Sequence, residues 1–203
     1  DVGIKDFVVT SDGEVFENLK LKRKNQKKLN RLHRNLSRKK KGSKNRQKAR
    51  IKLSKFYQKL KNKKEYYLHQ VSNSLINENQ VIVTETLNVN GMLKNHNLAR
   101  SIQELSLFRF KEMLRYKAKW YDRELIEIDQ FYPSSKRCNN CGSINKNLKL
   151  SHRTWKCKSC VHEHDRDLNA AKNILDQGKQ FLNTKENKIG SSSPKSTPLE
   201  SSQ

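Results

Sequence analysis

Acidic residues are missing between Lys20 and Lys64, and this stretch carries 22 of the 44 Lys and Arg residues of the chain. The formal net charge of the whole chain is +24. Solvent-exposed helices usually mix both signs of charge, so a long run of one sign indicates a polyanionic partner. Nucleic acid is the natural one, because each neutralised phosphate releases condensed counterions. A solvated basic face that binds nothing is the alternative.

Long apolar runs are also missing. No stretch of about 18 apolar residues occurs, which excludes a membrane-spanning helix, and residues 1–6 lack the apolar region of a signal peptide. The basic stretch lacks the aromatic-rich apolar face of a helix that lies on an anionic membrane. We therefore predict an intracellular protein with no membrane partner. The chain does not begin with methionine, which predicts a fragment or a processed product.

The chain has only four cysteines, and they are regularly spaced. Two C-x2-C pairs are separated by fifteen residues: Cys138, Cys141, Cys157 and Cys160. Such pairs bring four thiolates to one Zn²⁺ ion, and disulfides are rare inside cells. Because four thiolates leave no open position, the zinc is predicted to be structural. His152, His162 and His164 lie nearby and are predicted to be surface or loop residues, since the cysteines already saturate the ion.

Short β-branched runs predict strands. Residues 3–10 and 14–16 flank the turn Ser11-Asp12-Gly13 and predict a hairpin. Residues 80–84 predict a buried strand that ends at Glu85, and a loop is expected at residues 88–91. Residues 125–129 predict a further strand.

Helical spacing of apolar residues fills the segments between these strands. Two stripes of leucines and aromatics predict a long basic helical hairpin over about residues 20–78, with its turn at Gly42-Ser43. A third amphipathic helix is marked by six residues: Ile102, Leu105, Phe108, Met113, Tyr116 and Trp120. A last helix from Leu168 to Asp176 is expected to end with Gly178 as its C-cap.

Three carboxylates stand at the ends of predicted elements. Asp1 begins the first strand, Glu85 ends the buried strand, and Asp167 begins the last helix. Each alone is unremarkable, since Asp167 could be an N-cap and the other two could be surface residues. Together with the hairpin, the strand and the closing helix, they suit an RNase H-like sheet, whose clustered acids hold two divalent ions.

Five segments, in order, carry a family resemblance: residues 1–7, 37–46, 83–92, 131–138 and 164–174. In these segments the chain resembles the TnpB-type (OrfB) proteins of bacterial insertion sequences, relatives of the single-protein CRISPR effector nucleases. The resemblance implies an α/β fold with a RuvC-like mixed sheet, a basic helical-hairpin insertion and an inserted four-cysteine zinc ribbon. It also implies a transposon-associated, RNA-guided DNA endonuclease of the kind commonly called a transposase. Its partners would be DNA and a transposon-derived guide RNA, in the cytoplasm of a bacterium and at the nucleoid when bound to DNA.

The resemblance also assigns residues. Asp1, Glu85 and Asp167 would be the catalytic acids and would ligate two Mg²⁺ ions, one activating water and the other stabilising the leaving oxygen. Asp165 would cap the helix or orient a ligand, and Arg166 would contact the scissile phosphate or form a surface salt bridge. Six basic residues would bind nucleic acid: Arg31, Arg38, Lys39, Lys40, Arg46 and Arg50.

The expected organisation is a RuvC-like nuclease domain over residues 1–178, with the zinc ribbon at about 134–164, and a disordered tail over 179–203.

Thr86 and Val161 depart from the family pattern, where Asp and Gly are usual. The wedge and recognition domains of the family are not found before Asp1. This predicts a truncated form, weakly active or inactive alone, in which the ammonium group of Asp1 would oppose Mg²⁺. A catalytically inactive nucleic-acid-binding remnant and an unrelated zinc-ribbon regulator are the alternatives.

Overall fold

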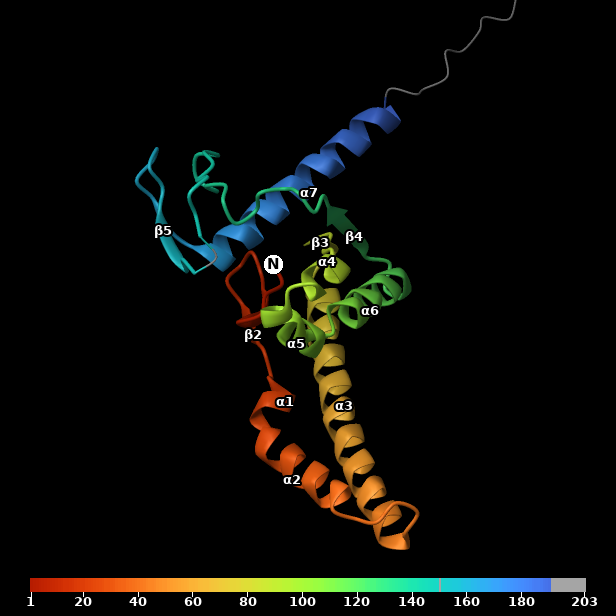
Figure 1. Ribbon diagram of the computed structural model, residues 1–203. Helices are drawn as coiled ribbons and strands as arrows, with labels where there is room; N and C mark the ends of the chain where they lie inside the picture. The colour runs from red at the N-terminus through yellow and green to blue at the C-terminus, as the bar shows by residue number, and fades with distance from the viewer. Residues whose placement is uncertain (150, 191–203) are drawn as a thin grey trace, which may run out of the picture.

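The computed structural model describes residues 1–149 and 151–190 and has the element order shown in Figure 1. Its strands are β1 (Asp6–Val9), β2 (Val15–Glu17), β3 (Val81–Glu85), β4 (Glu124–Ile128), β5 (Thr154–Lys156) and β6 (Glu163–Asp165). Its helices are α1 (Leu21–Lys24), α2 (Gln26–Ser37), α3 (Lys44–Glu78), α4 (Val89–Leu93), α5 (His96–Leu105), α6 (Leu107–Trp120) and α7 (Arg166–Gly190). None of these described helices has the length and apolar character needed to cross a membrane.

The described strands form three separate two-stranded sheets. β1 pairs antiparallel with β2, β3 pairs parallel with β4, and β5 pairs antiparallel with β6. The chain is therefore a mixed α/β protein, as predicted, but the expected continuous mixed sheet is not formed by the described residues. Among the described strands, β1 and β3 do not pair with each other: residues of both line one cavity, and both strands contact α7.

The main hydrophobic core lies between α3, α5, α6 and β1. Its most deeply buried side chains come from the second half of α3 and from the inner faces of α5 and α6, for example Leu68, Ile76, Ile102 and Met113. Lys117 is buried in this core, where its Nζ donates to Ser72 Oγ at 2.6 Å. Burial lowers the pKa of Lys117, and the hydrogen bond to Ser72 offsets part of the cost of enclosing this amine.

The helical hairpin predicted for residues 20–78 is present. α2 and α3 pack through leucines from both stripes, including Leu29, Leu32, Leu53 and Leu60. Gly42 takes the left-handed conformation (φ 80°) in the turn, and Ser43 Oγ caps α3 by accepting from the Arg46 main-chain nitrogen. Figure 1 shows the hairpin extending away from β3, β4 and α7.

Two helical predictions were wrong in detail. The helix expected across residues 102–120 is broken at Ser106, whose left-handed φ of 56° separates α5 from α6. This break rotates the following residues, so Phe108 and Trp120 are exposed while Leu107 and Leu114 are buried. The loop expected at residues 88–91 contains the short helix α4, which Asn88 caps through its side chain.

The last helix is longer than predicted. α7 runs from Arg166 to Gly190, so residues 179–190 are helical and not part of a disordered tail; residues 191–203 lie outside the described residues. Residues 179–190 contain no proline, and helix formers such as Lys, Gln, Leu and Glu make up half of the segment. Gly178 therefore lies inside the helix and is not its C-cap.

Gly178 allows α7 to approach β3 closely. A Cβ atom at this position would lie 2.4 Å from Val83 Cγ2 and 2.6 Å from Val83 Cγ1. Gly178→Ala is therefore expected to destabilise the protein by about 1–3 kcal/mol through overpacking, despite the gain of about 1 kcal/mol in helix propensity. Thermal unfolding measures the change. Adding Val83→Ala should restore part of the loss, and a double variant no more stable than Gly178→Ala would contradict this mechanism.

Candidate metal centre and acidic site

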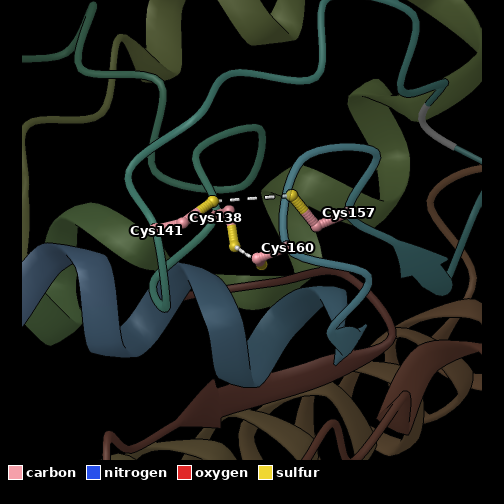
Figure 2. Close-up of side chains that lie close together, drawn as sticks. All are labelled: Cys138, Cys141, Cys157 and Cys160. Carbon is pink, nitrogen blue, oxygen red and sulfur yellow. Dashed lines mark hydrogen bonds between the residues drawn. The ribbon is translucent and has the colours of Figure 1, made fainter.

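The four cysteines form one compact cluster, as the spacing predicted (Figure 2). All four Sγ atoms lie within 4.8 Å of one another. The Cys138–Cys160 and Cys141–Cys157 Sγ–Sγ distances are both 3.6 Å. A tetrahedron with Zn–S bonds of about 2.3 Å has edges of about 3.8 Å, whereas a disulfide is about 2.05 Å long. The cluster could thus hold a metal ion such as zinc.

The surroundings of the four thiols differ. Burial raises the pKa of Cys138 to about 12. Hydrogen bonding lowers the pKa of Cys157 to about 5, and the largest contribution comes from the Ser143 hydroxyl, whose Oγ lies 3.1 Å from Cys157 Sγ. His164 was predicted to be a surface or loop residue, and this is wrong: it is 7% exposed, with Nε2 3.0 Å from Cys138 Sγ. The reason is that His164 lies on the inner face of β6, against Trp155 of β5.

The two cysteine pairs are held by matching turns. The Gly142 N–H donates to Cys138 O at 2.8 Å, and the Val161 N–H donates to Cys157 O at 3.0 Å. Gly142 and Val161 occupy equivalent positions, and both have left-handed φ, 77° and 63°. Glycine tolerates this region freely, whereas a β-branched residue is strained there. Val161 therefore carries the backbone strain of the second turn.

Val161→Gly is expected to stabilise the cysteine module (residues 138–165) by about 1 kcal/mol. The relief of about 1–2 kcal/mol of backbone strain is larger than the conformational-entropy cost of introducing glycine. Thermal unfolding of the metal-loaded protein measures it. The matched control is Gly142→Ala, which should lower stability by a similar amount: its Cβ would be 3.5 Å from Arg137 Nη2, an ordinary contact, so only backbone strain is added. Equal stability of all three proteins would contradict the assignment of strain.

Two asparagines of α7 dock the cysteine module. Asn169 and Asn173 are one helical turn apart and almost fully buried. Asn169 accepts from the Asn139 N–H at 3.0 Å and donates to Arg137 O at 2.8 Å, and Asn173 donates to Ser134 O at 2.8 Å. This role was not predicted from the sequence. Two asparagines spaced i, i+4 around Ala170-Ala171 were the available signal, since small residues permit close packing and amides can pair with main-chain groups.

The three predicted acids lie on three different elements and are linked electrostatically through the amino group of Asp1. The amino group of Asp1 interacts electrostatically with both Glu85, at the end of β3, and Asp167, in the first turn of α7. Burial nevertheless lowers the pKa of this amino group to about 6. Burial likewise raises the pKa of the Glu85 carboxyl, while the Asp1 amino group and Lys111 oppose that change. The three residues thus share one electrostatic environment.

The carboxylates do not form a closed metal cluster. In residues 1–149 and 151–190, only the four cysteines bring three or more ligand atoms of His, Cys, Asp or Glu within 4.8 Å of one another. Asp167 is turned toward Arg153 of the cysteine module, with Oδ2 3.3 Å from Nη1. Asp165 is the N-cap of α7: its Oδ1 accepts from the Asp167 and Leu168 main-chain nitrogens, both at 3.0 Å. Of the two roles considered for Asp165, the structure shows the cap.

A basic group beside Glu85 was not foreseen. Lys111 of α6 interacts with Glu85 and also pairs with Glu127 of β4 at 2.7 Å. Arg115 pairs with Glu127 from the next turn of α6, again at 2.7 Å. Glu127 thereby ties α6 to β4 and holds Lys111 near the end of β3. Spacing along one chain cannot reveal such a contact between a helix and a strand.

The six basic residues singled out from the sequence lie on or beside the helical hairpin. Five of them are exposed: Arg31, Arg38, Lys39, Lys40 and Arg50. Arg46 differs, because its Nη1 donates to Leu36 O at 3.1 Å and to Lys39 O at 3.0 Å. These bonds give Arg46 a structural role in closing the turn between α2 and α3.

Two family models match the chain in adjacent segments. The model described as "Probable transposase" (OrfB_IS605) matches residues 1–96, and the model of the Cas12f1-like TNB domain matches residues 108–174. The first segment contains β1 to β3 with Asp1 and Glu85. The second contains the cysteine module and Asp167.

Named relatives agree with these models. A protein of Streptomyces pristinaespiralis named "Putative RNA-guided DNA endonuclease" is 43% identical over 88% of this chain and 44% of its own length. The Escherichia coli protein named "Putative RNA-guided DNA endonuclease InsQ" is 33% identical over 90% of this chain and 49% of its own length. The chain therefore spans about half the length of the curated relatives it matches.

A solved structure supports the fold. The chain superposes on a chain of the cryo-EM structure of a Cas12f1–sgRNA–target DNA complex with a TM-score of 0.55 and 21% identity, over 85% of this chain and 47% of the other. At this identity the likeness concerns the fold alone. Together, the two family models and the named relatives show that the chain belongs to the TnpB-type (OrfB) family of insertion-sequence proteins.

Proposed function

We propose that this chain forms the nuclease part of an RNA-guided DNA endonuclease that hydrolyses phosphodiesters at Asp1, Glu85 and Asp167. The observation that carries the proposal is the electrostatic interaction of the Asp1 amino group with both Glu85, at the end of β3, and Asp167, in the first turn of α7. Family membership supports the same reaction class and speaks against an unrelated zinc-ribbon regulator. A RuvC-like domain over residues 1–178, with the zinc ribbon at about 134–164, is the corresponding organisation.

The donor chemistry fits Mg²⁺. Carboxylate oxygens are the ligands that this hard cation prefers, and Asp1, Glu85 and Asp167 supply them from separate elements. When bound, paired Mg²⁺ ions would supply an activated water and stabilise charge on the attacking and leaving oxygens. The cysteine cluster fits the softer Zn²⁺ ion in a closed, structural site. The two sets of ligands thus suit different metals.

The chain's own residues prepare this site. Burial makes the Glu85 carboxylate costly to ionise alone, so a positive partner is needed there, and Lys111 supplies part of that charge. Arg153 holds Asp167 in an ion pair, and the carboxylate keeps further lone pairs that can bind a metal ion. The Arg153 guanidinium can also contact a phosphate oxygen, the role first considered for Arg166.

Nucleic acid would contact the helical hairpin. Arg31, Arg38, Lys39, Lys40 and Arg50 present exposed positive charge along α2, the turn and α3, and Arg46 supports the turn. DNA and a transposon-derived guide RNA are the proposed partners, in line with the names of the relatives. Binding through such residues should weaken steeply as salt rises.

Cleavage of a plasmid target tests the proposal. The protein is expressed together with RNA transcribed from its own insertion sequence, and Glu85→Gln is compared with Glu163→Gln, an exposed acid of β6. Magnesium-dependent cleavage that Glu85→Gln abolishes and Glu163→Gln retains supports a nuclease. Salt-sensitive binding without cleavage by the unsubstituted protein would favour the nucleic-acid-binding remnant instead.

A further inference from the structure

The first cysteine of each C-x2-C pair is buried. Cys138 is 0% exposed and Cys157 is 3% exposed, whereas Cys141 is exposed. Four thiolates outweigh one divalent cation, so the metal-loaded cluster would carry net negative charge. Water can hydrogen-bond to the sulfur of Cys141, but the two buried sulfurs depend on donors from the protein.

Each buried sulfur has contacts of two kinds. Main-chain N–H groups of its own C-x2-C turn donate to it. A side chain also contacts each one. His164 Nε2 lies 3.0 Å from Cys138 Sγ, and Ser143 Oγ lies 3.1 Å from Cys157 Sγ and 3.2 Å from Cys141 Sγ. These two side chains cross over between the halves of the cysteine module, because Ser143 follows the first pair and His164 follows the second.

The β5–β6 hairpin holds His164 against the cluster. His164 is the register partner of Trp155, whose ring centroid lies 4.7 Å from that of the imidazole. In the part of the chain that the structure describes, the ligand atoms that lie within 4.8 Å of one another are those of the four cysteines and do not include His164. His164 therefore stands beside one sulfur and not in the place of a fifth ligand.

The hydrogen of this contact can come only from the imidazole once a metal is bound. A metal-bound thiolate has lost its proton, so it can only accept. An imidazole nitrogen that bears a hydrogen donates it, and the nitrogen that faces Cys138 is Nε2. Hydrogen-bond partners of metal ligands typically change metal affinity by about 10–100-fold.

We propose that His164 sets the metal affinity of the cysteine cluster through an Nε2–H···Sγ hydrogen bond to Cys138. Ser143 serves the second pair in the same way, so each half of the cysteine module stabilises a buried thiolate of the other half. Because the two donors cross over, metal binding is coupled to the docking of the two halves. This role of His164 rests on metal binding by the four cysteines and is independent of DNA cleavage.

Nuclear magnetic resonance of the cadmium-loaded protein tests the bond directly. The ¹¹³Cd²⁺ ion binds thiolates as Zn²⁺ does, and its nuclear spin couples to protons across an N–H···S hydrogen bond. The Hε2 proton of His164 is expected to be visible and to show this coupling, which replacement by Zn²⁺ should abolish. A cadmium-loaded protein without the coupling at His164 would overturn the proposal. A protein that binds neither ion would overturn the assignment of the cysteine cluster itself.

Zinc affinity, measured by competition with a chromogenic chelator, separates hydrogen bonding from packing. His164→Phe keeps a ring against Trp155 but removes the donor, so affinity should fall by at least about tenfold. His164→Gln retains an N–H group near the same place and should stay within about threefold of the unsubstituted protein. The matched control is His162→Phe, at an exposed ring 4.7 Å from His164, which should leave affinity unchanged. Unchanged affinity in His164→Phe, or an equal loss in His164→Gln, would contradict donation by Nε2.

Discussion

Asp167→Asn is expected to lower the rate of DNA cleavage by at least about 10³-fold, whereas Asp165→Asn should leave it within about twofold. The two residues are both carboxylates at the start of α7, but their contacts differ. Asp165 Oδ1 caps the helix by accepting from two main-chain N–H groups, a role that asparagine fills equally well. Asp167 instead interacts with the Asp1 amino group and pairs with Arg153.

The loss at Asp167 would come from metal binding, since an amide supplies one neutral oxygen where the proposed site requires a charged ligand. The measurement is single-turnover cleavage across a range of Mg²⁺ concentrations, with thermal unfolding of both variants. Asp167→Asn should also be about as stable as the unsubstituted protein, because it loses only a partly exposed ion pair. A large loss of cleavage in Asp165→Asn, or normal cleavage in Asp167→Asn, would exchange the roles of the two residues.

The cysteine site could be predicted from the sequence because it is local. Two C-x2-C pairs each form a tight turn, and a short hairpin of β5 and β6 brings the turns together, so spacing alone determines which atoms meet. The left-handed position after Cys141 was also foreseeable, because Gly142 stands there. That Val161 adopts the same conformation could not be inferred from its side chain, which disfavours it.

The contacts that depend on tertiary packing were not predictable in the same way. His164 was predicted to be a surface or loop residue because the four cysteines already saturate the ion, but alternation along β6 turns it inward against Trp155. Gly178 looked like a helix end, and only the close approach of Val83, on another element, gives a reason for a glycine inside α7. Ser106 breaks a helix that periodicity treated as continuous, since no local signal marks its left-handed backbone.

The acidic site could be predicted in part: its residues could be named from the sequence, but their partners could not. The sequence supplied the residues and the resemblance supplied their grouping, and the electrostatic proximity of Asp1, Glu85 and Asp167 is consistent with both. The partners of these acids could not be read from the sequence. Lys111 comes from α6 and Arg153 from the cysteine module, each brought to the acids by a contact between elements far apart in the chain.

Loss of zinc is expected to impair Mg²⁺-dependent cleavage although no cysteine touches the proposed catalytic ligands. The cysteine module leads directly into Asp167, since β6 ends at Asp165 and α7 begins at Arg166. The Arg166 N–H also donates to Arg153 O at 2.8 Å, which fixes the start of α7 against β5. A structural zinc ion supplies much of the folding free energy of so small a module. Without it, the start of α7 loses this support.

Cys157→Ser should therefore release zinc, weaken the affinity for Mg²⁺ and lower cleavage by about 10²-fold, the effect of misplacing a reacting group by about 1 Å. Ser159→Ala is the matched control, because its exposed side chain lies in the same turn between Cys157 and Cys160. Zinc content is measured with a chromogenic chelator, and Mg²⁺ affinity from the concentration dependence of cleavage. If Cys157→Ser loses zinc but keeps the Mg²⁺ dependence of the unsubstituted protein, the module does not position Asp167. Its docking through Asn169 and Asn173 would then serve stability alone.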